Sequence, residues 1–205
     1  MIKTLIAGAA SVGALLAASA ASAAVVTTGS LTYDTDNYAD SVTVVQGTVT
    51  TAANAVDGDL STRITQNGRF DPNAFGEGDI LRFDFDNLFL QNGAGFDIII
   101  FEFGVGENSN VMLSMNGVSA AGQFIEATNQ PFGTLSAYGY DLSDFGIAAG
   151  AFAGSSLFLT PNGNVTPNIA EIVALNAAPI PLPGAALFLG TGLLGLAAAR
   201  RRKAA

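Results

Sequence analysis

Leu81-Arg82-Phe83-Asp84-Phe85-Asp86 is the first of three segments in the middle of the chain that indicate its architecture. The other two, which follow it in order, are Asn92-Gly93-Ala94-Gly95 and Phe96-Asp97-Ile98-Ile99-Ile100-Phe101-Glu102-Phe103. In the first segment apolar and charged residues alternate, which predicts a strand with one buried and one solvated face. The second segment has the composition of a turn. The third segment is apolar on both faces, so we expect it to be a central strand of a sheet.

The flanking sequence continues as short apolar runs separated by Gly, Asn and Asp turns. Residues 111–115 end at Asn116-Gly117, which is a strong hairpin signal. Further strands are expected over residues 25–33, 42–49, 123–127, 135–142, 157–160 and 169–175. Eight or nine strands in about 150 residues predict an all-β fold, an antiparallel jelly-roll β-sandwich.

The N-terminus has the three parts of an export signal. Lys3 provides a positive charge, residues 5–18 are apolar and uncharged, and Ala21-Ser22-Ala23 fits the small-x-small cleavage rule. Ala18-Ser19-Ala20 fits the same rule equally well, so the sequence offers two starts of the mature chain, three residues apart. We therefore expect residues 1–23 to be a secretory signal helix and the protein to be exported.

The C-terminus carries a proline motif, an apolar run and a basic end. The motif is Pro179-Ile180-Pro181-Leu182-Pro183-Gly184, the apolar run covers residues 185–199, and Arg200-Arg201-Arg202-Lys203 follows. The 20 residues from Ile180 to Ala199 match the roughly 20 that a transmembrane helix needs. The basic end predicts that this end stays in the cytoplasm and that the body lies across the membrane.

This tail resembles the PEP-CTERM class of bacterial sorting signals, in its VPLPA-type branch. The motif here is Ile180-Pro181-Leu182-Pro183-Gly184, with Ile for Val and Gly for Ala, and Arg200, Arg201 and Arg202 complete the signal. The resemblance implies an exosortase membrane protease as partner and delivery to the cell surface or secretion. An uncleaved tail would instead be a permanent anchor. The expected parts are a signal peptide (1–23), the β-domain (24–178) and the sorting signal (179–205).

The predicted β-domain is strongly acidic. It contains all 17 acidic residues of the chain but only three of the eight basic ones, Arg63, Arg69 and Arg82. Such a charge repels nucleic acid and favours the capture of divalent cations. We therefore expect no nucleic-acid partner.

The absence of Cys and His excludes several kinds of cross-link, catalysis and metal site. Disulfides, thiol catalysis, histidine relays and the common zinc sites are all excluded. A hydrolase acting on extracellular polysaccharide with carboxylates alone remains the alternative to a non-enzymatic protein. Asp97 and Glu102 face opposite sides of a regular strand, so they cannot form its acid/base pair. For Glu102 we expect a strand end with access to water, the alternative being a buried ion ligand.

Residues 54–63 contain Asp57-Gly58-Asp59 and, shortly after, Ser61-Thr62-Arg63. This stretch resembles the calcium loop of discoidin-like, galactose-binding-like jelly rolls. The resemblance implies Ca²⁺ as cofactor, with Asp57, Asp59, Thr62 and Glu171 as ligands and backbone carbonyls near Asn54 completing the shell. The oxygen-rich turn also suits Ca²⁺ on chemical grounds, since this ion takes six to eight hard oxygen ligands. An ordinary metal-free turn is the alternative.

A glycan is a further candidate ligand, although the usual stacking residue is missing. Ile64 stands where the resembling family commonly has Trp, and the chain has no Trp at all. Four tyrosines offer aromatic surface in its place: Tyr33, Tyr38, Tyr138 and Tyr140. Tyr138 and Tyr140 point the same way on their strand, either as a binding face or as half-buried residues. The sequence thus predicts an exported, non-enzymatic, calcium-binding protein with an extracellular polysaccharide as candidate partner.

Overall fold

The computed structural model describes residues 24–64, 74–104, 106, 108–163 and 166–180. The predicted signal helix, the transmembrane run and the motif residues Pro181, Leu182, Pro183, Gly184, Arg200, Arg201 and Arg202 lie outside these residues. Of the helices within the described part, none has the length and apolarity needed to cross a membrane.

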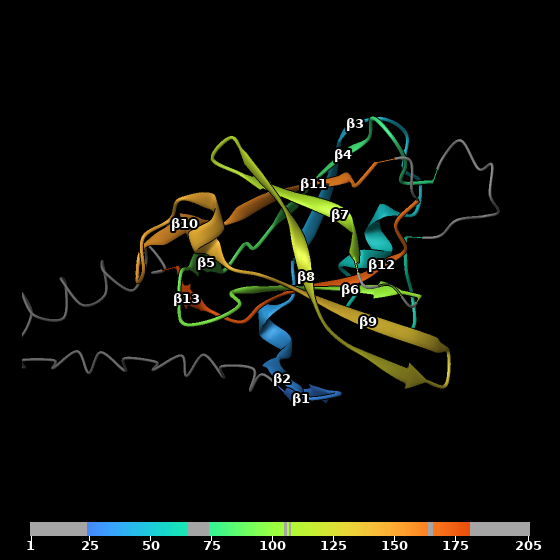
Figure 1. The fold of residues 1–205 in the computed structure, drawn as a ribbon, viewed down its shortest axis with the longest axis horizontal. Coiled ribbons are helices and arrows are strands. Elements are labelled where there is room, and N and C mark those ends of the chain that lie inside the picture. Colours follow the sequence, from blue (N-terminus) through green and yellow to red (C-terminus); the bar gives the residue numbers. More distant parts are fainter. Residues whose placement is uncertain (1–23, 65–73, 105, 107, 164–165, 181–205) are drawn as a thin grey trace, which may run out of the picture.

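The described residues form an antiparallel β-structure with three short 3-10 helices (Figure 1). The strands are β1 (Val25–Thr28), β2 (Leu31–Asp34), β3 (Ser41–Gln46), β4 (Ile80–Asp84), β5 (Leu88–Gln91), β6 (Ile98–Phe103), β7 (Asn108–Met115), β8 (Val118–Gln130), β9 (Gly133–Tyr140), β10 (Phe152–Gly154), β11 (Ser156–Pro161), β12 (Ile169–Ala174) and β13 (Ala177–Pro179). The 3-10 helices are η1 (Thr35–Asn37), η2 (Ala52–Ala55) and η3 (Leu142–Phe145).

Eight strands make one large, curled sheet in the order β12-β6-β9-β8-β7-β11-β4-β3. Its two edge strands approach each other at the start of β3. Tyr38 forms a bridge with Val173 of β12, and the Ala39 N–H donates to the Ile172 carbonyl at 3.0 Å. A sheet that curls back on itself in this way can enclose a core without a covering layer of helices.

The main core lies inside the curled sheet, and a second cluster lies outside it. Ile98 and Ile100 of β6 face the main core, whereas Ile99, Phe101 and Phe103 face the second cluster. The hairpin of β1 and β2 covers this outer cluster, with the Tyr33 ring 5.6 Å from that of Phe101. β6 is therefore buried on both faces, as the apolar run 96–103 predicts.

The alternating strand and the predicted hairpin are also confirmed. Leu81, Phe83 and Phe85 are fully buried, while the charged residues between them are partly or fully exposed. At Asn116 and Gly117 the chain adopts φ values of 52° and 79°, the left-handed conformation that a tight β7–β8 turn requires.

Several predicted strand boundaries are wrong. Residues 25–33 form two strands rather than one, because Gly29 turns the chain at φ 62°. β3 ends at Gln46, β8 has 13 residues rather than five, and β9 ends at Tyr140.

A second, three-stranded sheet in the order β10-β5-β13 was not expected from the sequence. Residues 177–179, where no strand was expected, form β13, which pairs with β5 from Leu88 to Leu90. These strands are only three or four residues long, too short for a clear alternating pattern.

Candidate metal centre

The loop predicted to bind calcium lies against β12. It follows η2, reaches positive φ at Gly58 (76°), and ends where the Ile64 N–H donates to the Ile169 carbonyl at 2.8 Å. The Asn54 side-chain amide donates to the Arg63 carbonyl at 2.8 Å and closes the loop at its base. These bonds hold the Asp57-Gly58-Asp59 turn beside Glu171, a residue 113 positions further along the chain.

Oxygen atoms crowd around the Thr62 hydroxyl. Its Oγ1 lies 3.1 Å from the Asn54 carbonyl oxygen and 3.0 Å from that of Asp59. It also lies 2.9 Å from Oδ1 and 2.7 Å from Oδ2 of Asp57. Carbonyl and carboxylate oxygens only accept hydrogen bonds, and one hydroxyl has one hydrogen to donate. Four acceptors therefore compete for a single proton, and a cation bound beside the hydroxyl by the same oxygens would relieve this competition.

Glu171 adds a buried carboxylate to this cluster. Its side chain is fully buried. Oε1 accepts a 2.6 Å hydrogen bond from the Gly58 N–H, whereas Oε2 is buried without a partner. Burial raises the pKa of this carboxyl to about 8, and the nearby Asp57 carboxylate adds to the increase, while the Gly58 N–H opposes it. An unpartnered buried carboxylate oxygen is uncommon in native proteins and calls for a ligand.

The structure brings together three of the four predicted ligand side chains, those of Asp57, Thr62 and Glu171. The fourth, Asp59, turns its carboxylate away, where Oδ1 accepts a 2.8 Å hydrogen bond from the Ser61 N–H. Hydrogen bonds from the Ser61 side chain and, to a smaller extent, from its backbone N–H lower the pKa of the exposed Asp59 side chain. It is the Asp59 backbone carbonyl that faces Thr62.

The donor set consists of oxygen alone. Among the residues that the structure describes, no group of three or more His, Cys, Asp or Glu side chains could hold a metal. A cation at this loop would therefore depend on two carboxylates, from Asp57 and Glu171, together with the Thr62 hydroxyl and two backbone carbonyls. Hard, neutral and anionic oxygens of this kind suit Ca²⁺ and are unsuited to zinc or copper.

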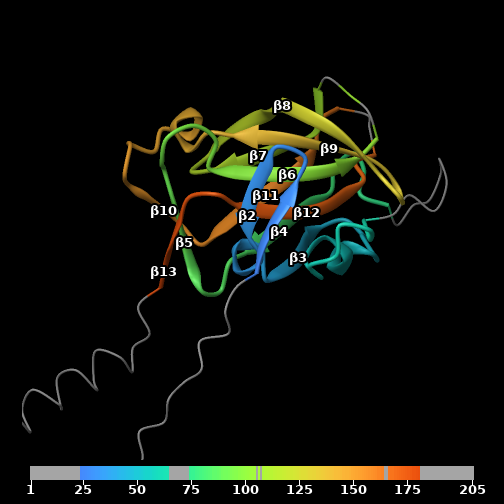
Figure 2. The same ribbon diagram turned by 90° about the horizontal axis from the view of Figure 1, so that it is seen from below.

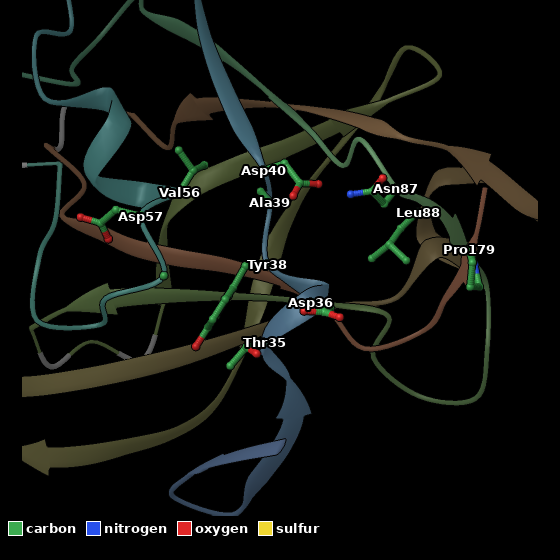
Figure 3. Close-up of a pocket in the computed structure, with 11 residues that line it drawn as sticks. Thr35, Asp36, Tyr38, Ala39, Asp40, Val56, Asp57, Asn87, Leu88 and Pro179 are labelled. Carbon is green, nitrogen blue, oxygen red and sulfur yellow. The ribbon is translucent and has the colours of Figure 1, made fainter. Parts of the chain in front are cut away.

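A pocket of about 510 Å³ opens beside the loop (Figure 3). Figure 3 shows Asp57 on one side, Asn87 and Leu88 on the other, and Tyr38 between them. Its complete lining is Thr35, Asp36, Tyr38, Ala39, Asp40, Val56, Asp57, Gly58, Asn87, Leu88 and Pro179. Three carboxylates and no basic side chain line it, so it is suited to a cation or to a ligand rich in hydroxyl groups.

The tyrosines do not form the exposed platform considered from the sequence. Tyr138 and Tyr140 are 1% and 2% exposed, so they are neither a binding face nor half-buried. Both belong to the main core, and the paired strand β8 contacts them: the Phe124 ring packs against Tyr138, and Gly122 lies against the Tyr140 ring. Of the four tyrosines, only Tyr38 lines the pocket.

The prediction that Glu102 has access to water is wrong. The side chain is buried in the main core, where it accepts a 2.7 Å hydrogen bond from Ser109 Oγ and a 3.2 Å bond from the Asn110 N–H. Burial raises its pKa above the ordinary value, although these bonds oppose the increase. The Tyr140 hydroxyl contacts the same Ser109 hydroxyl at 3.0 Å. Nothing in the sequence pattern signalled this network.

Asp97 and Glu102 have separate partners, in agreement with the expectation that they form no pair. Asp97 accepts hydrogen bonds from the N–H groups of Gly93 and Leu142 and from the Asn176 amide, at 2.7 to 2.8 Å. These bonds connect the Asp97 carboxylate to the β5–β6 turn, to η3 and to the end of β12. Asp97 therefore holds these parts of the fold together.

Comparison with protein-family models, with curated proteins and with solved structures found no match for this chain. The functional assignment therefore depends on the geometry of the loop and pocket and on the sequence of the two ends.

Proposed function

We propose that this chain is an exported, non-enzymatic surface or matrix protein whose β-domain binds Ca²⁺ at the loop of residues 54–62 and Glu171. The observation that carries the proposal is the convergence of oxygens described above: four acceptors around the Thr62 hydroxyl, beside a buried Glu171 Oε2 without a partner. In the alternative of a metal-free turn, Glu171 stays mostly protonated at neutral pH, in agreement with its raised pKa of about 8.

Six protein oxygens are available to the ion. They are the two Asp57 carboxylate oxygens, the Asn54 and Asp59 carbonyls, the Thr62 hydroxyl and Glu171 Oε2. Ca²⁺ accepts six to eight oxygens in flexible geometry, including bidentate carboxylates, whereas Mg²⁺ demands a near-ideal octahedron and keeps several waters. The ion would supply charge compensation for two carboxylates, and its task in this proposal is to stabilise the fold.

The jelly roll remains our proposal for the topology of the sandwich. The antiparallel pairings, the curled sheet and the position of the loop against the late strand β12 support it. In the discoidin-like class that residues 54–63 resemble, the calcium loop lies against a late strand in the same way.

Calcium binding is tested by thermal unfolding of the purified protein in EDTA, in Ca²⁺ and in Mg²⁺. Extracellular calcium modules bind with Kd values of about 10⁻⁴ to 10⁻³ M, so 10 mM Ca²⁺ should raise the Tm by several degrees. Thr62→Val keeps the side-chain shape but removes the hydroxyl, and it should abolish most of the increase. Thr43→Val, at an exposed position of β3, is the matched control and should keep the increase. An unchanged wild-type Tm on adding EDTA or Ca²⁺ would rule out the site.

Sorting by an exosortase, through transient insertion in the inner membrane, is the second part of the proposal. It is supported by the resemblance of residues 179–205 to PEP-CTERM signals and by the small-x-small site at residues 21–23. Mass spectrometry of the native product separates the outcomes. A new C-terminus near Pro183 supports cleavage, whereas an intact Lys203 supports a permanent anchor.

We propose an extracellular polysaccharide as the ligand of the pocket beside the loop. Carboxylates of Asp36 and Asp40 and the amide of Asn87 can hydrogen-bond to sugar hydroxyls, and the volume of about 510 Å³ accommodates one or two sugar rings. Sedimentation with matrix polysaccharide from the producing cells tests this. Asn87→Ala should weaken binding, whereas the exposed and distant Asp144→Asn should not.

A further inference from the structure

The three-stranded sheet carries an apolar pocket of about 360 Å³, lined by Phe89, Phe152, Gly154 and Pro179. We call this surface the exit face, because strand β13 leaves the domain there. Phe152 is 57% exposed, more than any other phenylalanine in the described ranges, and its ring lies 5.9 Å from that of Phe89. Phe89 is partly buried. Exposure of the Phe152 ring and part of the Phe89 ring to water is unfavourable, which indicates a surface that is covered in use.

The sequence that follows identifies what covers it. β13 pairs with β5, and the Ile180 N–H donates to the Asn87 carbonyl at 2.8 Å, so the chain is fixed to the domain up to residue 180. Only residues 181–184 separate that anchor point from the apolar run 185–199. Even fully extended, this spacer spans at most about 17 Å.

We propose that the exit face rests on the lipid interface of the membrane while the tail is still attached. The inference depends on the proposed insertion of residues 185–199 in the bilayer. If they are inserted, the short spacer holds Phe89 and Phe152 at the height of the headgroups. Apolar surfaces that contain Phe are buried at the boundary between headgroups and acyl chains, and burial of an exposed Phe side chain there removes apolar surface from water.

The charge around the exit face restricts which lipid it accepts. No charged residue lines the apolar pocket, but Pro179 also borders the acidic pocket that contains Asp36 and Asp40. Carboxylates this close to the membrane would be repelled by anionic headgroups. A zwitterionic bilayer of phosphatidylcholine is therefore the appropriate probe.

The chain contains no Trp, so a single substitution provides a clean fluorescent reporter. The full chain with Phe152→Trp is reconstituted in phosphatidylcholine vesicles with brominated acyl chains. Phe124→Trp is the matched control: Phe124 is 41% exposed, and Figure 2 shows its strand, β8, on the opposite side of the domain from β13. We expect the Trp at position 152 to shift to shorter wavelength and lose most of its emission, and the Trp at position 124 to do neither.

Flotation of the same vesicles tests the proposed membrane insertion separately from the exit-face inference. If the chain does not float with the vesicles, the proposed membrane insertion is wrong and the inference fails with it. If the chain floats but bromine quenches the two reporters equally, insertion stands and the exit-face inference is overturned. Because Phe152 is exposed, the larger indole ring should fit; Phe89→Trp serves as the second reporter and should give the same quenching.

Discussion

Replacement of Glu171 by Gln should stabilise the metal-free protein, an unusual outcome for a fully buried position. The pKa of Glu171 is about 8 in the folded protein, against an ordinary value of 4.5. Below the ordinary pKa, a carboxyl whose pKa is raised on folding is protonated in both the folded and the unfolded state, and its contribution to stability is fully present. As the pH rises towards the pKa of the folded protein, the unfolded state loses its proton first, and this contribution is lost. Between pH 4.5 and pH 7 the loss accumulates at about 1.4 kcal/mol per pH unit, so Glu171 costs the metal-free fold about 3 kcal/mol at neutral pH.

Gln has the same shape as Glu but no charge to neutralise. Its carbonyl oxygen can still accept the hydrogen bond that Gly58 donates to Glu171 Oε1, and its amide can donate towards Asp57. In EDTA at pH 7 the variant should therefore unfold about 6 to 12 °C above the wild type, from a shift of about 2 to 4 °C per kcal/mol for a domain of this size. At pH 5 the difference should fall below about 1 kcal/mol, because little of the cost has accumulated there.

Calcium should reduce this advantage. Ca²⁺ at ten to a hundred times its Kd stabilises the wild type by about 1.4 to 2.7 kcal/mol, whereas the variant has lost an anionic ligand and should gain little. Calorimetry at pH 5 and pH 7, with EDTA or Ca²⁺, measures all these differences, and Asp144→Asn provides an exposed carboxylate as control. If Glu171→Gln unfolds below the wild type in EDTA at pH 7, Glu171 is not an uncompensated buried carboxylate and the argument for the metal centre collapses.

Three further outcomes are expected from the structure. Asp57→Asn should abolish most of the calcium-induced rise in Tm, whereas Asp59→Asn should keep it, because only the backbone carbonyl of Asp59 faces the site. Burial raises the pKa of Glu102, so wild-type stability in urea unfolding should decline as the pH rises above 4.5, and Glu102→Gln should flatten that decline. A Cβ at Gly139 would collide with the ring of Phe96, so Gly139→Ala should lose about 1 to 3 kcal/mol in the same assay. A Cβ at Gly76 would make only an ordinary contact at 3.8 Å, so Gly76→Ala should lose much less.

The strands of the large sheet were predictable where periodicity was strong. Alternation at residues 81–86 and apolarity on both faces at 98–103 are direct results of burial on one side or on two. The three-stranded sheet was not predictable, because its short strands take their partners from distant parts of the chain. Strand β8 continued well beyond its apolar residues for a similar reason: its neighbours β7 and β9 supply the hydrogen bonds, whatever its composition.

The sequence predicted which residues lie at the candidate site, but not which atoms of each residue face it. Asp57, Thr62 and Glu171 were expected together from a resemblance, and the structure places them in one cluster. The outward turn of the Asp59 carboxylate follows from a local hydrogen bond to Ser61, which residue types alone do not reveal. Glu102 accepts hydrogen bonds from Ser109 and Asn110, seven and eight positions further along the chain, and these contacts depend on how β7 lies relative to β6, a strand with which it does not pair. The pocket beside the loop is built from four separate segments, so no motif could signal it.

The contact between Gly58 and Glu171 joins residues 113 positions apart, so it can form only once nearly the whole domain has been made. Cytoplasmic free calcium is scarce and extracellular calcium is plentiful. If the chain is exported as proposed, the loop holds no ion before translocation, and the burial of Glu171 then lowers the stability of the fold and makes the chain easier to unfold for secretion. After export, Ca²⁺ at the proposed site would stabilise the folded domain.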